Sequence, residues 1–274
     1  DIVSYPMPRI MYIKKQFPDA KRICQIKDEI VNFLTGEYVT DIYTWRGLAN
    51  AETGRYSKKM LKFLNIDERM LPRLETPFAK AGYITKEAEK LTGIESGTPV
   101  FTGCNDYYAG LLGMGITKSG AIFDITGTSE HIGVTLDELV TDNKAVYSPY
   151  FGTNVLYGVT GSSGSAMSFG IKNFPFDSIN IEKSLEKNAP IFLPYLAGAR
   201  APIYDSKARG VFFGISRDTE TEDMAYSVLE GAAFSAYAIY ETIKDKVNAS
   251  SVLTAGGAAA DLKYNLLKAS LFGN

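Results

Sequence analysis

Apolar residues in the first hundred positions recur at the three-to-four-residue spacing of amphipathic helices. Proline and glycine mark the ends of these segments, such as Pro8 at the start of "PRIMYIKKQF" and Gly36 after "KDEIVNFLT". A short strand is expected after Gly36, and the apolar stretch 98–104 predicts a strand that leads into a helix through about Gly115. The segments predicted as helices are 8–17, 27–36, 56–66 and 85–93.

The pattern changes between residues 120 and 160, where short β-rich runs are separated by polar or glycine turns. We expect four strands that form a meander here, namely "AIFDIT", "EHIGVT", "AVYSPYF" and "NVLYGVT". Helical spacing returns after a capping-box pattern at Thr219 and Glu222 and continues to about Ile243. The segment 251–273 then predicts a strand, a double-glycine turn and a helix.

Strand-glycine-helix units therefore occur in both halves of the chain, which predicts an α/β fold. A molecule of two lobes with a cleft between them is the expected arrangement. The boundary is expected near residues 117–121, where "ITKSGA" supplies polar and glycine residues, giving a first lobe at 1–118 and a second lobe at 119–274.

Composition limits the function classes. The 274 residues are 45% hydrophobic and 22% charged, which is typical of a globular protein with a sizeable core. The net charge of −2 and the lack of a long Lys/Arg run argue against nucleic acid as the main partner. The apolar runs are far shorter than the roughly 20 residues of a membrane helix, and "DIVSYPMPRIMYIKK" lacks the order of a signal peptide. We therefore expect a soluble, cytoplasmic protein without a membrane partner.

Few residues are available for thiol or imidazole chemistry. The two cysteines, Cys24 and Cys104, lie far apart, which argues against a disulfide framework or a four-ligand metal site. His131 is the one histidine, so histidine-based zinc chemistry and a Ser-His-Asp triad are poorly supported. No metal ligand is assigned.

Two successive strand ends carry groups suited to phosphoryl transfer. Asp106 follows the apolar strand at 98–104, and Gly127, Thr128 and Ser129 follow "AIFDIT". A carboxylate can accept a proton from an alcohol, and exposed backbone N–H groups in a turn can hold phosphate. Each feature also has a structural interpretation: Asp106 would serve as a helix N-cap, and the glycine turn would only connect two strands.

The segment "GVFFGISRDTETEDMAYSVLE", Gly210 to Glu230, resembles the second signature of the FGGY carbohydrate kinases throughout its length. Just upstream, "FLPYLAGARAPIYDSKARG" is similar to the family segment that precedes it. "SYPMPRIMYIKKQ" resembles the first signature, with Arg9 in place of the usual Lys and Tyr12 in place of the usual Trp. "LTGEYVTD", "ANAETGRYSKKMLKFLNI" and "GTPVFTGCNDYYAGLLGMGI" follow the family in order, so the resemblance covers nearly the whole chain.

The resemblance implies a ribonuclease-H/actin-like ATPase fold, with sugar bound by the first lobe and ATP by the second. It also implies incomplete lobes, because the family's Asp-x-Gly-Thr/Ser phosphate motif does not occur before residue 8 and the chain stops in the helix after the adenosine loop. We therefore expect a fragment, or chain breaks near residues 1, 137–145 and 174–190. Such a fragment would bind ATP weakly, phosphorylate no sugar and associate through exposed sheet edges.

The resemblance also implies roles for individual residues. Asp106 would be the catalytic base beside the sugar, and Tyr107 would replace the family's usual Gln there. ATP would bind to the Gly-Thr-Ser turn and to the family's adenosine loop, with Mg²⁺ screening the phosphates. The double glycine is also explained by a tight turn, and the serine-glycine stretch at Gly164 by a loop. No role in the family corresponds to His131, so we interpret it as structural. The residues implied for ATP are Gly127, Thr128, Ser129, Gly164, Gly256, Gly257, Ala258 and Asp261.

The resulting prediction is an ATP-dependent carbohydrate kinase acting on a sugar or polyol. A pentulose such as xylulose is the leading substrate, because the Pro-Tyr-Leu and Gly-Thr-Ser segments are closer to xylulose kinases than to glycerol kinases. A homodimer is compatible with the sequence. The alternative is a catalytically silent actin-like protein that binds ATP or senses sugar. An actin-fold chaperone ATPase is disfavoured by the sugar-kinase signature.

Overall fold

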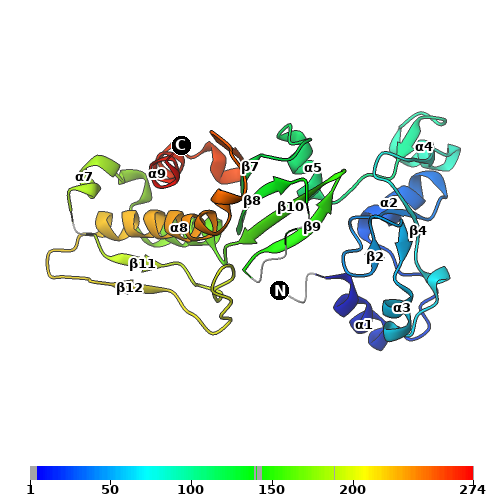
Figure 1. The fold of residues 1–274 in the computed structure, drawn as a ribbon, viewed down its shortest axis with the longest axis horizontal. Helices are drawn as coiled ribbons and strands as arrows, with labels where there is room; N and C mark the ends of the chain where they lie inside the picture. Colours follow the sequence, from blue (N-terminus) through cyan, green and yellow to red (C-terminus); the bar gives the residue numbers. More distant parts are fainter. Residues whose placement is uncertain (1–4, 139, 141–143, 188, 274) are drawn as a thin grey trace. The chain divides into compact units, whose positions relative to one another are not determined.

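The computed structural model describes residues 5–138, 140, 144–187 and 189–273. These residues form two compact units that divide between Gly110 and Leu111 (Figure 1). The predicted chain breaks fall partly on residues 1–4, 139, 141–143 and 188, which lie outside the described residues. The assignment of sugar to the first lobe and ATP to the second stays a prediction.

The first unit contains helices and short strands that pair in twos. Strand β1 pairs with β4 in parallel, and β2 with β3 and β5 with β6 pair in antiparallel fashion. The elements are α1 (Pro6–Gln16), α2 (Ile26–Thr35), β1 (Val39–Asp41), β2 (Ala49–Asn50), β3 (Arg55–Tyr56), α3 (Lys58–Leu64), β4 (Arg73–Glu75), β5 (Lys80–Tyr83), α4 (Lys86–Thr92) and β6 (Pro99–Phe101), with α5 (Asp106–Gly113) crossing the division.

The helices predicted for the first unit are confirmed, with small shifts at their ends. Helix α2 ends at Thr35 and is capped by Gly36, whose φ of 81° is left-handed and therefore suits glycine. Helix α1 begins at Pro6 instead of Pro8, because Tyr5 is extended and proline fits the first helical position. Trp45 and Leu48 lie at the centre of the core of this unit.

The second unit is built around a five-stranded sheet with the order β13-β7-β8-β10-β9. Strands β7, β8, β10 and β9 run antiparallel to their neighbours, while β13 pairs with β7 in parallel. The predicted meander is wrong in one step, because β10, and not β9, pairs with β8. The bounds are β7 (Ile122–Thr126), β8 (Glu130–Leu136), β9 (Val146–Tyr150), β10 (Thr153–Val159) and β13 (Val252–Ala255).

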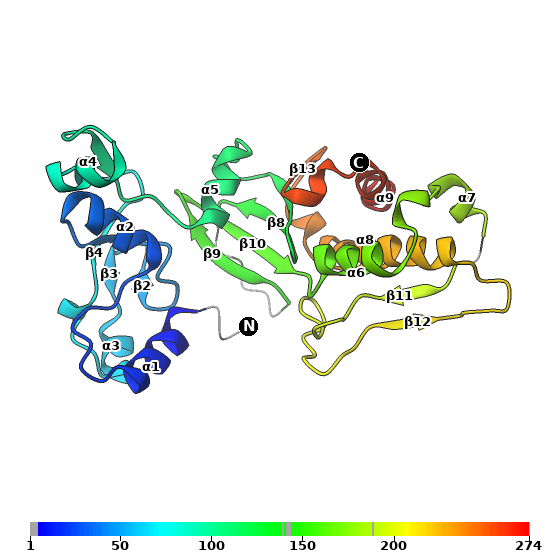
Figure 2. The ribbon, with the colours of Figure 1, turned by 180° about the vertical axis from the view of Figure 1, so that it is seen from behind.

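Helices α8 (Thr221–Ile243) and α9 (Leu262–Phe272) pack against this sheet, and α6 (Ser163–Asn173) packs against α8. The ribbon of β11 (Ile191–Leu193) and β12 (Val211–Phe213) lies along α8 (Figure 2), and α7 (Ile181–Leu185) follows α6. The predicted capping box of α8 is displaced by one residue: Glu220 and Asp223 form it. The Thr219 hydroxyl instead accepts the N–H of Ser216 at 2.9 Å.

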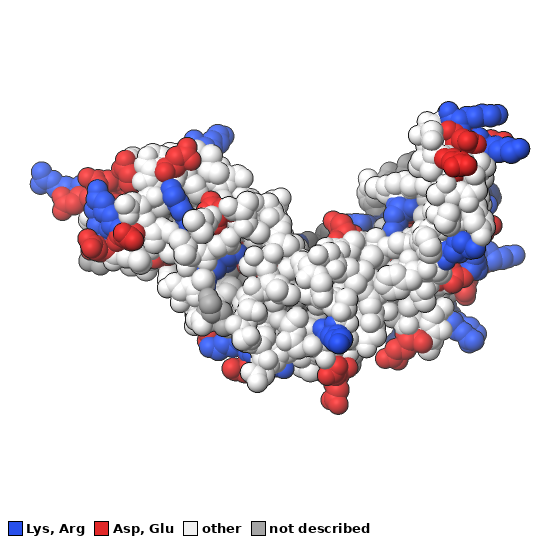
Figure 3. Space-filling view, turned by 90° about the horizontal axis from the view of Figure 1, so that it is seen from above, with Lys and Arg blue, Asp and Glu red and all other residues white. Residues whose placement is uncertain are grey.

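The aromatic residues of 147–157 and 192–213 were expected in the core, and this is correct for part of them. Tyr150, Tyr157 and Phe192 are buried, whereas Tyr204 and Phe213 are exposed. Both cysteines are free. Acidic and basic side chains are interspersed on the face drawn in Figure 3. Over the described ranges, none of the helices combines the length and apolar character needed to cross a bilayer.

Candidate functional site

Asp106 stands at the first position of α5, and its carboxylate is exposed. The cap of this helix comes from the preceding residue, because Asn105 Oδ1 accepts the N–H of Tyr108 at 3.0 Å. Asp106 Oδ1 accepts the N–H of Tyr107, also at 3.0 Å. The structural interpretation of Asp106 as the N-cap therefore does not hold, and its side chain is accessible to a ligand.

Aromatic packing fixes the start of α5 within the first unit. Tyr108 is buried, and its ring meets the edge of Tyr43 with 5.8 Å between ring centroids. Tyr107, the residue predicted to contact sugar, is half-buried, and its ring lies 5.4 Å from that of Tyr108. The exposed carboxylate of Asp106 therefore projects from an anchored helix end.

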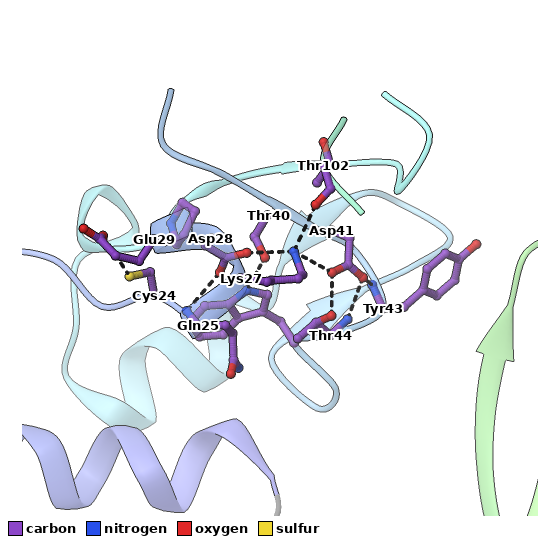
Figure 4. A network of polar contacts seen from close by, with 12 residues as sticks. Cys24, Gln25, Lys27, Asp28, Glu29, Thr40, Asp41, Tyr43, Thr44 and Thr102 are labelled. Carbon is purple, nitrogen blue, oxygen red and sulfur yellow. Dashed lines mark hydrogen bonds and ion pairs between the residues drawn. The ribbon is translucent and has the colours of Figure 1, made fainter. Parts of the chain in front are cut away.

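A lysine-centred group of polar side chains contacts Thr102, in the segment that precedes α5 (Figure 4). Lys27 Nζ lies 2.7 Å from Asp28 Oδ1 and 3.0 Å from Asp41 Oδ2, and donates to the carbonyl of Thr102 at 3.5 Å. We call Lys27, Asp28, Asp41 and Thr102 the first-unit network. It connects α2 and the end of β1 to the segment that leads from β6 into α5.

In the second unit, the predicted phosphate turn connects β7 to β8. The N–H of Gly127 donates to the carbonyl of Ser129 at 2.8 Å, so this donor is used inside the turn. Gly127 and Thr128 are exposed, and Ser129 is half-buried. The remaining groups of the turn that could meet a ligand are therefore those of Thr128 and Ser129.

Two of the predicted glycines pack directly against this turn. A Cβ at Gly164 would overlap with the Gly127 carbonyl, and the adjacent Ser165 N–H donates to the carbonyl of Thr128 at 3.0 Å. Gly256 has a φ of 95°, and a Cβ there would overlap with the backbone of Thr126. The structure thus brings the turn, the start of α6 and the double-glycine segment together, and explains Gly164 and Gly256 by close packing.

The rest of the predicted adenosine loop behaves differently. Gly257 is exposed, and a Cβ there would have no atom within 4 Å, so packing does not require glycine at this position. Ala258 packs partly against the neighbouring core. Asp261 caps α9 by accepting the N–H of Tyr264 at 3.0 Å. His131 packs its ring 5.8 Å from that of Tyr157, in agreement with a structural role.

A second lysine-centred group lies beneath the turn. Lys268 Nζ donates to Asp124 Oδ2 at 2.5 Å, to Glu130 Oε1 at 3.1 Å and to Thr126 Oγ1 at 3.4 Å. Tyr264 Oη donates to Glu130 Oε2 at 2.6 Å. We call these five residues, Asp124, Thr126, Glu130, Tyr264 and Lys268, the second-unit network. All five are buried.

The two carboxylates of this network have opposite pKa shifts. Burial raises the pKa of Asp124, and the charge of Glu130 raises it further, which together outweigh the effect of Lys268. Burial also raises the pKa of Glu130, but Lys268 and the surrounding hydrogen bonds reverse the shift and lower it. One lysine faces two carboxylates, so Asp124 is the member that keeps a proton to higher pH.

Sequence reasoning did not find either network, although one signal was present. Asp124 and Lys268 each interrupt an apolar run, "AIFDIT" in a predicted strand and "NLLKASLF" in a predicted helix. A charged residue at such a position is almost never fully buried without a partner. The sequence could therefore have predicted an ion pair, but not which residues form it.

Comparisons with known proteins identify the class. The sequence model for the N-terminal domain of the FGGY family of carbohydrate kinases matches residues 5–113, and that for the C-terminal domain matches residues 124–274. Together they cover most of the chain. The chain therefore belongs to the FGGY family of carbohydrate kinases and has the family's α/β, actin-like ATPase fold.

The relatives are named for several different substrates. The chain is 28% identical to a xylulose kinase of Staphylococcus xylosus, with 98% of this chain and 59% of the relative covered. It is 26% identical to a gluconokinase of Bacillus licheniformis, with 97% and 58% covered. The crystal structure of ligand-bound xylulose kinase from Lactobacillus acidophilus superposes with a TM-score of 0.85 at 27% identity, covering 98% of this chain and 58% of that one. The chain thus spans somewhat more than half the length of these relatives.

Proposed function

We propose that this chain is part of an ATP-dependent carbohydrate kinase, which transfers the γ-phosphate of ATP to a hydroxyl of a sugar or polyol. The observation that carries the proposal is the meeting of three segments in the second unit: the 127–129 turn, the start of α6 at Gly164, and Gly256–Gly257. Backbone at turns and glycines can approach phosphate closely. Family membership supports nucleotide as the ligand.

In the proposed reaction, Asp106 accepts the proton of the sugar hydroxyl as its oxygen attacks the γ-phosphorus. A bond forms between that oxygen and phosphorus, the bond to the β-phosphate oxygen breaks, and ADP leaves. The exposure of the Asp106 carboxylate supports this role, since a base must reach its substrate. Thr128, Ser129 and Gly257 would contact ATP.

Mg²⁺ would neutralise charge on the phosphate oxygens. The part of the chain that the structure describes holds no cluster of three or more potential ligand residues. Magnesium at such sites is bound mainly by phosphates and water with one or two carboxylates, so it does not need a cluster of three protein ligands. We assign no residue to the metal.

A pentulose such as xylulose is the proposed substrate, because a xylulose kinase matches at 28% identity in sequence and with a TM-score of 0.85 in structure, against 26% and 0.83 for gluconate kinases. Gluconate and glycerol are the alternatives that must be tested, since gluconokinases and a glycerol kinase match at similar identity. Tyr107, in place of the family's usual Gln, is the residue that we expect to influence this choice.

The experiment is a coupled ADP-release assay on the full-length product of the gene, with pentuloses, gluconate, hexuloses and polyols. We expect release that depends on one sugar. Asp106→Asn should lower kcat by about 10²-fold while leaving ATP binding unchanged. Asp19→Asn, which removes another exposed acid of the first unit, is the control and should keep normal turnover.

The outcomes separate the candidates. ATP binding without turnover on any sugar would favour the catalytically silent alternative. Normal turnover in Asp106→Asn would remove Asp106 from the mechanism without removing the kinase assignment.

A further inference from the structure

Lys268 occupies an unusual position for a lysine. It lies in the middle of α9, and only 3% of its side chain is exposed. Its Nζ contacts Asp124, Thr126 and Glu130, so all three of its protons have an acceptor. A buried lysine retains its charge only with such partners. The proposed reaction does not use this group.

The partners of Lys268 border the 127–129 turn on both sides. Asp124 and Thr126 belong to β7, which enters the turn, and Glu130 is the first residue of β8, which leaves it. The Thr126 hydroxyl also donates to Glu130 Oε1 at 2.8 Å, which ties the two strand ends to each other. Lys268 therefore donates hydrogen bonds to residues of both strands that flank the turn.

The other proposed nucleotide segment, 256–260, directly precedes the same helix. Asp261 caps the start of α9, directly after Gly256–Ala260, and Tyr264 one turn later holds Glu130 at 2.6 Å. Tyr264 and Lys268 are four residues apart and therefore lie on one face of the helix. The parallel pairing of β13 with β7 and the close approach of Gly256 to the Thr126 backbone place the 256–260 segment beside the turn. The bonds of Tyr264 and Lys268 join α9 to the same two strand ends.

We propose that Lys268 is a positioning residue for nucleotide binding: through Glu130 and Asp124 it holds the 127–129 turn at a fixed distance from the 256–260 segment, so that both contact one nucleotide. This inference rests on the proposed function. It differs from a purely stabilising role, because loss of the lysine should change the spacing of two surface segments while the core of the unit persists.

The test compares ATP and ADP dissociation constants by calorimetry on the full-length product of the gene. Lys268→Met should weaken both nucleotides about tenfold or more, since small displacements of positioned groups are costly. Lys268→Arg, which keeps the charge, should bind within about threefold of wild type. The matched control is Leu156→Ala, which opens the core of the same unit away from the network and should bind nearly as wild type does.

Hydrogen exchange provides a second readout in case Lys268→Met folds poorly. In the milder Tyr264→Phe variant, amides of 126–130 and 256–260 should exchange faster together, while those of α8 keep their protection. Unchanged nucleotide affinity in a folded Lys268→Met, or equal weakening in Leu156→Ala, would overturn the positioning role. Wild type that binds no nucleotide would instead overturn the proposed function, a distinct outcome.

Discussion

Each unit contains a lysine that bridges two buried carboxylates, but the two networks differ in how much they depend on that lysine. The side chain of Lys27 is 22% exposed, whereas that of Lys268 is 3% exposed. In the first-unit network, backbone N–H groups also serve the carboxylates: Gln25 donates to Asp28, and Tyr43 and Thr44 donate to Asp41. In the second-unit network, the described donors to both carboxylates are side chains.

The difference shows that buried carboxylates beside a lysine can be compensated in two ways. Carboxylates with backbone donors keep hydrogen bonds when the lysine is removed, and water can reach the remaining space. When the lysine is removed, carboxylates that only side chains contact lose much of the interaction that offsets their burial. An uncompensated buried charge is costly. The second-unit network should therefore be the more sensitive one, and it is the one beneath the proposed nucleotide segments.

The largest expected effect is that of Lys268→Met, which should lower the free energy of unfolding of the second unit by about 3–5 kcal/mol. The reason is that Asp124 and Glu130 remain buried with one cation fewer. Urea unfolding followed by far-UV circular dichroism measures the loss. Trp45, the one tryptophan, is buried in the first unit, so its fluorescence reports that unit separately.

Two results would contradict this prediction. A loss below about 1 kcal/mol would mean that the two carboxylates need no cation, as for a protonated pair. A Trp45 transition displaced as far as the dichroism transition would mean that the units unfold as one, so that the two networks cannot be compared by unit. Lys268→Arg is the matched control and should lose much less.

Gly257→Val should produce the next largest effect, a weakening of ATP binding by about tenfold or more. A branched side chain would occupy the space that the nucleotide is proposed to approach, while the open surroundings of Gly257 leave the fold unaffected. Calorimetry and thermal unfolding together measure this. Gly164→Ala is the contrasting variant: a Cβ there overlaps with the Gly127 carbonyl, so it should lose stability first. Equal loss of stability in both variants would mean that the fold requires glycine at both positions.

Lys27→Met should have a smaller effect, a loss of about 1 kcal/mol in the first unit. Asp28 and Asp41 keep their backbone donors, and the space left by the half-buried lysine is reached by water. The Trp45 fluorescence transition should shift, and the part of the dichroism transition that belongs to the second unit should not. A loss as large as that of Lys268→Met would remove the distinction between the two networks.

How much the sequence predicted depends on whether a feature is local. Helix ends at Gly36 and Gly93 and the strands of 122–159 were predictable, because each follows from neighbouring residues. The pairing of β10 with β8 was not, since several strand orders satisfy the same alternation. The capping box of α8 was missed by one residue because Glu220 and Asp223 provide the same chemistry as the predicted pair.

The candidate site shows the same limit. Family resemblance selected Asp106, the 127–129 turn and the double glycine, but only the structure separates glycines that packing requires, Gly164 and Gly256, from Gly257, which it does not. The second-unit network joins residues 124 and 268, which are far apart in the chain. No local pattern specifies which buried acid meets which lysine, so this part of the site is visible only in the folded structure.

The smallest expected effect is a difference in pH dependence between the two carboxylates of the second-unit network. The pKa of Asp124 is raised by burial and by Glu130, so its favourable contribution is present below its unfolded pKa and is lost as pH rises through the folded value. The pKa of Glu130 is lowered, because Lys268 and hydrogen bonds outweigh burial. Its contribution is present above its unfolded pKa and is lost as pH falls through the folded value.

Asp124→Asn and Glu130→Gln should therefore change stability with opposite pH slopes. Relative to wild type, Asp124→Asn should become more favourable as pH rises above about 4, where the unfolded aspartate ionises. Glu130→Gln should become less unfavourable as pH falls below about 4.3, the unfolded value of glutamate. Thermal unfolding of the three proteins between pH 3 and pH 8 measures both slopes. Parallel slopes would mean that Lys268 stabilises the charges of Asp124 and Glu130 equally. The two networks would then differ only in how deeply their carboxylates and lysine are buried.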